Sequence, residues 1–571
     1  MPTDLVRGFL DGCLKFCQLI IADTPNPFSE TTGSADMPTS QFDYIVVGAG
    51  AAGAILADRL SEDGRHTVCL LEAGPSDWHP YLHIPAGFIK VLFDPAFTWT
   101  FSSEPTNWTD GRRIPLPQGR TLGCSTSING LVYNRGQAED FDDWAAMGNP
   151  GWSYQDVLPY FQRTERYAGG EDRFRGRDGR LPVSDLSWIH PICEQFIAGA
   201  QELGMPRNPD YNGANQAGVG YFQRSIDGRW RMSTSRTFLR AARSRPNLTI
   251  ITHAHASSVM WEGQRAVGVR YRRGARGEVE STVRAAREVI LSCGAVNTPK
   301  LLQLSGVGPA DQLNTLGIPV VAHVPGVGAN LSDHYSVRFV AQAQGISTIN
   351  ELARAPRLWG QVANWLLGRP NVLAVSPSLV HWFWQSRPGL TRPDLQGVFA
   401  PASYRKGYVG MLDEYPGMTC GVWQHRPHSR GYVRLQSPDS RVDPLIQPNY
   451  LDDERDRQVL LDGMKLARQL LKTSALTRYV QTETLPGAAV HSDDELLDFA
   501  RQYGVSSYHL NGSARMGAVD DPTAVVDPQL RVKGVIGLRV ADASVMPAIV
   551  SANTCAATMM IAEKAADLIR H

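Results

Sequence analysis

The strongest constraint on the fold is a glycine-rich turn that directly follows a short apolar segment. Residues 42–47 read Phe-Asp-Tyr-Ile-Val-Val, the composition of a strand buried on both faces of a parallel sheet. The turn at 48–53 has glycine at its first, third and sixth positions, and a helical pattern follows it. A second apolar strand over 67–72 ends in Glu72. This order of strand, turn, helix, strand and acid predicts the nucleotide-binding half of a doubly wound α/β fold.

The three glycines and the acid have separate predicted roles. Gly48 permits the tight turn, Gly50 lets the backbone approach a pyrophosphate, and Gly53 lets the helix pack closely on the strand. The free N–H groups and the dipole at the start of the helix attract phosphate groups. Glu72 lies roughly 20 residues past the last glycine, where a carboxylate accepts hydrogen bonds from an adenosine ribose. An acid there argues against a 2′-phosphate, and a plain strand–helix turn without a ligand is the alternative interpretation.

The composition excludes several classes of function. The 571 residues carry 56 Lys and Arg against 56 Asp and Glu, a formal net charge of zero, so neither nucleic acid nor an anionic membrane is expected as a partner. The eight cysteines are scattered without a C-x-x-C pair, which predicts neither a disulfide framework nor a metal site. A reducing, cytoplasmic location is therefore expected. No run of ~18 uncharged apolar residues occurs in the sequence, so no integral membrane segment is predicted.

The nucleotide-binding domain is expected to be assembled from both ends of the chain. A buried strand over 538–545 and a helix over 556–569 have the composition to close the sheet that begins at residue 42. Further strands are expected at 247–251, 266–271 and 288–293, and further helices at 144–161 and 191–203.

The expected fold class is α/β, a doubly wound nucleotide-binding domain with a second, cap domain of sheet and helices. The first domain is assigned residues 41–155, 226–330 and 508–571, and the cap domain is assigned 156–225 and 331–507. Residues 1–40 are expected to form an extension that is disordered or partly helical, because an amphipathic segment is followed by a stretch rich in Pro, Ser, Thr and Gly.

Four blocks, far apart in the chain, carry a recognisable combination of motifs. The first is the glycine turn with Glu72, and the second, at 119–133, reads GRTLGCSTSINGLVY. The third, at 294–308, reads GAVNTPKLLQLSGVG, and the fourth joins 508–517 to 540–554. Together they resemble the glucose–methanol–choline (GMC) oxidoreductase family from the first strand to the C-terminus. The resemblance implies a flavoenzyme that binds FAD and oxidises a small-molecule alcohol.

The resemblance also implies which residues contact the FAD. Those expected at the ADP half are Gly48, Gly50, Ala51, Ala52, Gly53, Glu72, Ala73 and Ala256. Those expected along the rest of the cofactor are Gly123, Asn129, Gly130, Leu131, Val132, Asp542, Ala543, Asn553 and Thr554. The alternative for Asn129 and Asp542 is that they are loop side chains whose hydrogen bonds are satisfied within the protein.

Three positions depart from the family pattern. Cys124 stands where the family has the second glycine of a pair, and both a small buried thiol that replaces it and a redox role are open. Ile128 stands where some choline-oxidising members have a histidine bonded to the flavin. Because an alkyl side chain cannot form that bond, non-covalent FAD is expected. Leu510 replaces the proline that usually follows the catalytic histidine, which would alter the shape of the pocket and leave the base in place.

The predicted chemistry is oxidation of an alcohol at the flavin. A base must take the hydroxyl proton, and neutral imidazole suits this task near pH 7. The family motifs identify His509 as that base and Asn553 as the residue that orients the substrate oxygen, where many members have a second histidine. The aromatic stretch at 380–384 favours a hydrophobic or aryl primary alcohol if it lines the pocket, and core packing is the equal alternative.

The resemblance leaves the electron acceptor open between oxygen and a quinone. It also leaves open two other reactions of the same fold, hydroxynitrile cleavage with a structural FAD and a light-driven reaction on fatty acids. Bleaching of the flavin by an alcohol in the absence of oxygen would separate oxidation from cleavage, and dependence on blue light would identify the third reaction.

Overall fold

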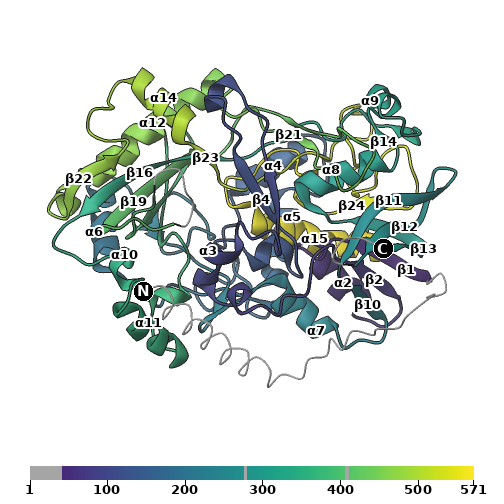
Figure 1. Cartoon of the computed structure of the whole chain (residues 1–571), viewed down its shortest axis with the longest axis horizontal. Coiled ribbons are helices and arrows are strands. Elements are labelled where there is room, and N and C mark those ends of the chain that lie inside the picture. Colours follow the sequence, from purple (N-terminus) through teal and green to yellow (C-terminus); the bar gives the residue numbers. More distant parts are fainter. Residues whose placement is uncertain (1–40, 275–278, 406–410) are drawn as a thin grey trace, which may run out of the picture.

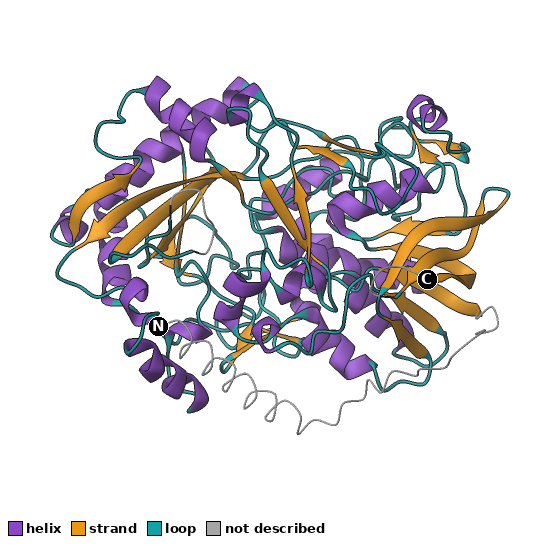
Figure 2. Cartoon of the chain, in the orientation of Figure 1, coloured by secondary structure: helices purple, strands orange, loops and turns teal. Residues whose placement is uncertain are grey.

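Two large sheets, one in each half of the molecule, organise the chain (Figures 1 and 2). The structure is a computed structural model that describes residues 41–274, 279–405 and 411–571. The extension expected at 1–40 lies outside these residues. Each sheet has its own hydrophobic core. The α/β fold class with a second domain of sheet and helices is confirmed.

The first sheet contains the glycine turn and has the order β10-β2-β1-β13-β12-β11, with β24 also paired to β13. Its strands are β1 (Gln41–Val47), β2 (Val68–Leu71), β10 (Leu248–Ile251), β11 (Ala254–Glu262), β12 (Arg265–Arg273), β13 (Val279–Leu291) and β24 (Leu538–Val540). The strands β10, β2, β1, β13 and β24 pair in parallel, as a doubly wound sheet requires. The expected strands are confirmed with two differences in length. The one expected at 288–293 is the end of the longer β13, and the last one ends at Val540 and not at residue 545.

Helices from both ends of the chain cover the first sheet. α2 (Gly53–Ser61) follows the glycine turn and packs against α15 (Thr554–Arg570), the C-terminal helix. The helix α2 is buried at almost every position, which its run of Ala, Ile and Leu permits. α8 (Gly294–Leu304) packs against β11. The predicted assembly of this sheet from both ends of the chain is therefore seen directly in the pairing of β13 with β1 and β24.

The single helix expected over 144–161 is wrong. Two helices, α4 (Ala138–Ala146) and α5 (Tyr154–Thr164), replace it. Between them Gly148 and Gly151 have φ of 88° and 84°. This left-handed backbone ends the first helix and turns the chain before the second.

The second sheet is antiparallel and has the order β22-β16-β19-β18-β17-β7, with β23 also paired to β16. Its strands are β7 (Gly218–Tyr221), β16 (Tyr335–Ala343), β17 (Val380–Trp384), β18 (Leu395–Ala400), β19 (Gly417–Gln424), β22 (Val480–Leu485) and β23 (Val505–Ser506). The helices that cover one face are α6 (Pro191–Glu202) and α12 (Glu454–Leu471), with α14 (Asp493–Tyr503) packed on α12. The helix α6 confirms the one expected over 191–203, and the opposite face of the sheet is free to line a cavity.

Smaller elements complete the described chain. The short strands are β3 (Thr98–Ser102), β4 (Pro115–Gly119), β5 (Glu165–Arg166), β6 (Leu181–Pro182), β8 (Ile226–Asp227), β9 (Trp230–Arg231), β14 (Val307–Gly308), β15 (Ala322–His323), β20 (Tyr432–Arg434) and β21 (Leu445–Gln447). The short helices are α3 (Phe88–Val91), α7 (Arg240–Ala242), α9 (Ala310–Thr315), α10 (Ile349–Leu352), α11 (Arg357–Leu366) and α13 (Ser474–Thr477). Among the helices of the described ranges, none is both long enough and apolar enough to cross a membrane.

Candidate active site

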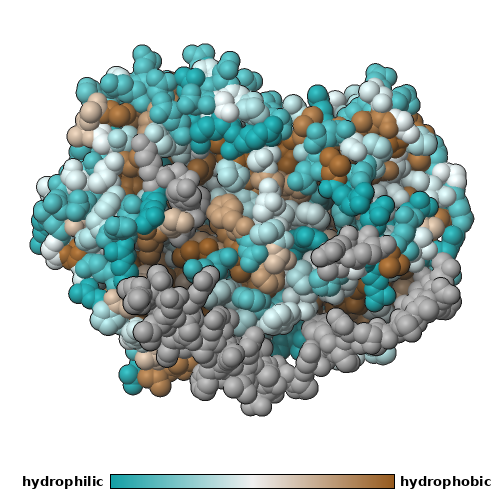
Figure 3. Space-filling view, viewed as in Figure 1, coloured by the Kyte–Doolittle hydropathy of each residue, from teal (hydrophilic) through white to brown (hydrophobic). Residues whose placement is uncertain are grey.

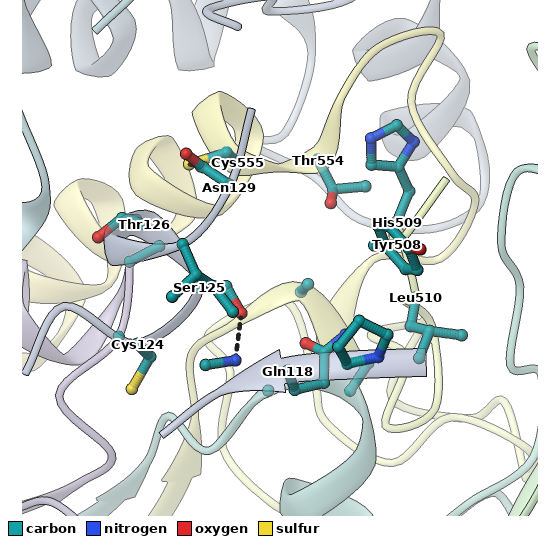
Figure 4. A pocket seen from close by; sticks show the side chains of 18 of the residues that line it. Gln118, Cys124, Ser125, Thr126, Asn129, Tyr508, His509, Leu510, Thr554 and Cys555 are labelled. Atoms are coloured by element: carbon teal, nitrogen blue, oxygen red, sulfur yellow. Dashed lines mark hydrogen bonds between the residues drawn. The ribbon is translucent and has the colours of Figure 1, made fainter. Parts of the chain in front are cut away.

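A cavity of about 390 Å³ lies between the two sheets and is lined by segments that range from Val47 to Thr558. The glycine turn and Glu72 line one end, and His509 and Asn553 line another part. Figure 4 shows the labelled side chains around an open space, with Cys124 and Ser125 opposite Tyr508 and His509. In the space-filling view, hydrophobic residues gather in a depression near the middle of the molecule (Figure 3). The cavity therefore brings the predicted cofactor end and the predicted catalytic residues into one site.

The glycine turn is shaped as a cradle for a ligand. A Cβ added at Gly48 would lie 2.5 Å from the Ser292 carbonyl oxygen, and one added at Gly53 would lie 1.8 Å from the Gly48 carbonyl oxygen. A Cβ at Gly50 would meet only the Cys124 side chain, at 3.4 Å. Gly48 and Gly53 are therefore required by the protein itself, whereas the space beside Gly50 is available to a ligand. The helix α2 has no side-chain N-cap, so its first N–H groups can bind phosphate.

Hydrogen bonds to the Glu72 carboxyl, one of them from Cys124, fix the conformation of the glycine turn. The buried Glu72 carboxyl accepts hydrogen bonds from the Ala49 N–H at 2.9 Å, the Gly74 N–H at 2.8 Å and the Cys124 thiol at 3.1 Å. Cys124 has φ of 42°, a left-handed backbone, which explains why glycine is the family residue there. Burial and the Glu72 charge raise the pKa of the thiol well above its usual value. Cys124 is therefore a hydrogen-bond donor, and the interpretation of it as only a small hydrophobe is incomplete.

The predicted cofactor residues fall into two groups. Most line the cavity: Gly48, Gly50, Ala51, Ala52, Glu72, Ala73, Asn129, Gly130, Leu131, Val132, Ala256, Asp542, Ala543, Asn553 and Thr554. Gly53 and Gly123 are not among the lining residues. A Cβ at Gly123 would lie 2.4 Å from Ser127 Oγ, and its N–H donates to the Ala49 carbonyl at 2.9 Å, so it joins two walls of the cavity.

Asp542 and Asn129 are both hydrogen-bonded within the protein. The Asp542 carboxylate accepts from the Gly294 N–H at 2.8 Å and the Thr298 hydroxyl at 2.6 Å. Asn129 Oδ1 accepts from the Leu131 N–H at 3.0 Å and from Arg231 Nη1 at 2.9 Å. Both side chains also line the cavity, so they hold its walls whether or not they contact a cofactor.

Arg231, which the sequence did not single out, is completely buried behind Asn129. Burial lowers the pKa of its guanidinium to about 9. Its other acceptors are backbone carbonyls, with Thr126 at 3.2 Å from Nη1, and no carboxylate of the described chain forms an ion pair with it. A buried cation without a counter-ion in the described chain therefore lies directly behind the part of the cavity wall that Asn129 forms.

His509 is the centre of a chain of hydrogen bonds between residues that lie far apart in the sequence. Its Nδ1 lies 2.9 Å from His334 Nδ1, and its Nε2 lies 3.0 Å from Asn553 Nδ2. His334 Nε2 lies 2.7 Å from the His425 carbonyl oxygen. A carbonyl only accepts, so His334 must carry its proton on Nε2 and accept at Nδ1. His509 must then donate from Nδ1, which leaves its Nε2 lone pair facing Asn553.

A buried carboxyl positions the two histidines. Asp333 Oδ1 accepts from the backbone N–H groups of His509 at 2.7 Å and His334 at 2.9 Å. Its Oδ2 accepts from Tyr450 and Ser506. Burial, together with His334, lowers the pKa of His509 well below its usual value. The imidazole is therefore neutral near pH 7, the form that a general base requires.

Asp333 and His334 were missed at the sequence level. They lie more than 170 residues from His509 in the chain. The usable signal was a polar Asp-His pair directly before the apolar strand β16. Hydrogen bonding to a residue so distant in the sequence could not be deduced from that pair.

The aromatic stretch 380–384 forms β17 and does not line the cavity. Trp382 and Phe383 are completely buried in the cores around the second sheet. Core packing is thus the correct one of the two interpretations. The aromatic residues that do line the cavity include Tyr404, Trp423 and Tyr508, and the Trp423 ring centre lies 6.2 Å from that of His509.

The two other departures from the family pattern line the cavity as apolar wall. Ile128 is 2% exposed and packs with Leu82 and Phe97. Leu510 is 5% exposed and packs with Ala295 and Val296. In the part of the chain that the structure describes, no group of three or more His, Cys, Asp and Glu is placed to hold a metal ion.

Comparison with known proteins agrees with this architecture. Two models of the GMC oxidoreductase family match residues 42–336 and 427–562. The oxygen-dependent choline dehydrogenase of Rhizobium etli is 40% identical over 531 residues, 93% of this chain and 95% of that protein. The alcohol dehydrogenase [acceptor] of Pseudomonas putida is 39% identical over 531 residues, 92% of this chain and 95% of that protein.

Two solved structures share the fold over nearly their whole length. Pyridoxine 4-oxidase from Mesorbium loti has a TM-score of 0.83 at 28% identity and covers 92% of this chain and 98% of its own. A formate oxidase variant from Aspergillus oryzae has a TM-score of 0.87 at 26% identity and covers 94% of this chain and 99% of its own. The chain therefore belongs to the GMC oxidoreductase family, the FAD-dependent oxidoreductases that act on CH–OH donors.

Proposed function

We propose that this protein oxidises a primary alcohol to an aldehyde, with His509 as the base and Asn553 as the residue that orients the substrate oxygen. The observation that carries the proposal is the chain from the His425 carbonyl through His334 to His509, which leaves an unprotonated Nε2 beside Asn553 Nδ2. An alcohol that replaces the Asn553–His509 hydrogen bond donates its proton to Nε2 and accepts from Nδ2. These are the two contacts that an incipient alkoxide needs.

The residues present fit a bound FAD. The turn at Gly50 leaves room for a pyrophosphate, Glu72 lies at the end of β2, and the wall from Asn129 to Val132 faces the second sheet. When bound, FAD supplies the acceptor for the hydride that leaves the alcohol carbon as the C=O bond forms. We propose that it is held non-covalently, because Ile128 offers no nucleophile at the position where some relatives form a bond.

The first test is an anaerobic titration of the yellow protein with alcohols, followed at the flavin absorbance band. Bleaching supports oxidation. A flavin that stays oxidised while a hydroxynitrile is cleaved would favour the lyase reaction, and turnover of a fatty acid only under blue light would favour the photochemical one. Acid precipitation should release the flavin into the supernatant, whereas a yellow pellet would contradict non-covalent binding.

The electron acceptor, the location and the domain limits are also proposals. We infer oxygen or a quinone as acceptor, and comparing peroxide formation with dye reduction separates them.

The scattered cysteines support a cytoplasmic location, and the six described ones are all unpaired. The limits 41–155, 226–330 and 508–571 for the FAD domain, with 156–225 and 331–507 for the cap, are supported by the membership of the strands in the two sheets.

The alcohol has two candidate classes. Tyr404, Trp423 and Tyr508 on the cavity wall support a hydrophobic or aryl primary alcohol. The names of the relatives support choline, a quaternary ammonium alcohol. Comparing benzyl alcohol with choline in the same titration decides between a neutral aryl substrate and a cationic one.

A further inference from the structure

Arg338 is a charged side chain on the cavity wall that has no partner in the described residues. It lies on β16, it is partly exposed, and it lines the cavity. No hydrogen bond or ion pair joins its guanidinium to any residue in the ranges that the structure covers. By contrast Arg426, which follows β19, donates to Gln137, Pro393 and Ser551. A guanidinium left without an acceptor inside a cavity is available to a ligand.

The strand places this cation on the same wall as the catalytic residues. Ser336 and Arg338 alternate with the buried Val337, so both face the cavity. Across β19, Ser336 pairs with Trp423, whose ring centre lies 6.2 Å from that of His509. Arg338 is therefore one step further from the base along one sheet face, about 7 Å along an extended strand.

The neighbouring strands leave room around the Arg338 side chain. Its partner on β19 is Gly421, which carries no side chain. A Cβ added at Gly421 would lie 2.9 Å from Val398 Cγ2 and 3.8 Å from Arg338 Cγ, so a larger residue would fill this space. The gap between Arg338 and Val398 belongs to the substrate part of the cavity.

The charge of Arg338 affects the pKa values of two tyrosines on the cavity wall. Burial raises the pKa of Tyr404 and raises that of Tyr508 to about 12, and the charge of Arg338 acts in the opposite direction on both. Both rings line the cavity. The Arg338 guanidinium thus lies within electrostatic range of two aromatic side chains of the cavity wall, which suit a flat apolar group next to an acidic one.

The carboxylates of the cavity lie at its other end. Among the described lining residues they are Glu72 and Asp542, and both accept hydrogen bonds from the protein. Near Arg338 the described wall carries no negative charge. A quaternary ammonium ion would therefore be repelled there, whereas a carboxylate would form charge-assisted hydrogen bonds.

We propose that Arg338 binds an acidic group of the substrate. The substrate is then a primary alcohol that also carries a carboxylate, on a short or aromatic carbon skeleton. This inference rests on the proposed function, because it places the hydroxyl of that substrate at His509. It replaces both choline and a neutral aryl alcohol as the preferred donor.

The test compares para-(hydroxymethyl)benzoate, benzyl alcohol and choline as donors for wild type and Arg338→Gln. In the wild type we expect kcat/KM for the carboxylated alcohol to exceed that for benzyl alcohol by roughly 10-fold to 100-fold, mainly through KM. Arg338→Gln should remove most of this ratio, and Arg338→Lys should restore part of it. Arg455→Gln, which removes an exposed arginine paired with Asp453, is the matched control and should keep the ratio.

Binding without turnover separates this inference from the proposed function. Benzoate should perturb the flavin spectrum of the wild type at a concentration that benzamide does not match, and Arg338→Gln should lose that difference. If benzoate binds through Arg338 but no alcohol bleaches the flavin, the proposed function fails and the anion site stands. If alcohols are oxidised and the ratio is the same in wild type and Arg338→Gln, or choline is the preferred donor, the anion site is wrong and the oxidation stands.

Discussion

The two ends of the cavity are built on different principles. At the cofactor end, Glu72 and Asp542 have their oxygens occupied by backbone and side-chain donors of the protein. At the substrate end, Arg338 has no acceptor among the described residues, and the Nε2 lone pair of His509 faces only an amide. At the cofactor end the protein satisfies the hydrogen bonds of its own carboxylates. At the substrate end, polar groups without such a partner are available to a reactant. Polar groups that a cavity leaves unsatisfied indicate where its chemistry takes place.

The largest effect is expected from filling the space beside Gly50 at the cofactor end. Gly50→Val should abolish FAD binding and all activity, because the branched side chain occupies the volume that the turn leaves open. The apoprotein should still fold, since a Cβ there meets Cys124 only at 3.4 Å. Flavin content and circular dichroism check this result. Gly360→Val, at a glycine with nothing within 4 Å of an added Cβ, is the control. A yellow Gly50→Val protein would contradict the assigned cradle.

Removing the base should damage only the substrate end. His509→Ala should remain yellow and folded while kcat falls by ~100-fold or more, the scale of a lost general base. Rapid anaerobic mixing with an alcohol measures the flavin reduction step directly. His491→Ala, at an exposed histidine just before α14, should behave as wild type. Near-normal reduction by His509→Ala would remove this residue from the mechanism.

A smaller effect is expected from the positioning residue behind the base. His334→Phe removes the acceptor that holds the His509 proton on Nδ1, and a loss of roughly 10-fold to 100-fold in kcat is expected, as for other residues that fix a tautomer. His334→Asn keeps an acceptor and should recover part of the rate.

The pH profile distinguishes positioning from a general structural loss. Burial first, and His334 second, lower the pKa of His509, so the neutral base persists well into acid and kcat/KM should fall only at low pH. Without His334 the pKa of His509 should rise, and the acid limb should move to higher pH. An unchanged acid limb with a lower rate would indicate that His334 only supports the fold.

The smallest expected effect concerns the residue that departs from the family glycine. Cys124→Gly relieves a left-handed backbone but loses the thiol hydrogen bond to Glu72, two opposing terms of about 1 kcal/mol each. The free energy of unfolding of the apoprotein should change by less than about 1 kcal/mol. Cys124→Ala keeps the strained backbone and loses the bond, so it should be less stable than Cys124→Gly. The reverse order in chemical denaturation would show that the backbone carries no strain.

The predictable part of the molecule is the part whose signals are local. The strand, turn and helix from Gln41 to Ser61 were predicted from adjacent residues. The strand that ends before Glu72 was predicted in the same way. The break between α4 and α5 was missed, because the helical pattern of residues 144–161 outweighed two glycines. The buried position of β17 was left open, because an aromatic run reads the same in a core and in a pocket wall.

The sequence by itself determined the first sheet and the family, since these depend on short motifs of glycines and buried apolar runs. It also supplied His509 as the candidate base, through the family motif around it. Tertiary structure alone decided which nitrogen of His509 is unprotonated, because that depends on His334 and the His425 carbonyl, which lie far from it in the chain. It alone placed Arg338 without a partner on the same wall. Hydrogen bonds and charges act through space over a few ångströms, and distance along the chain carries no record of them.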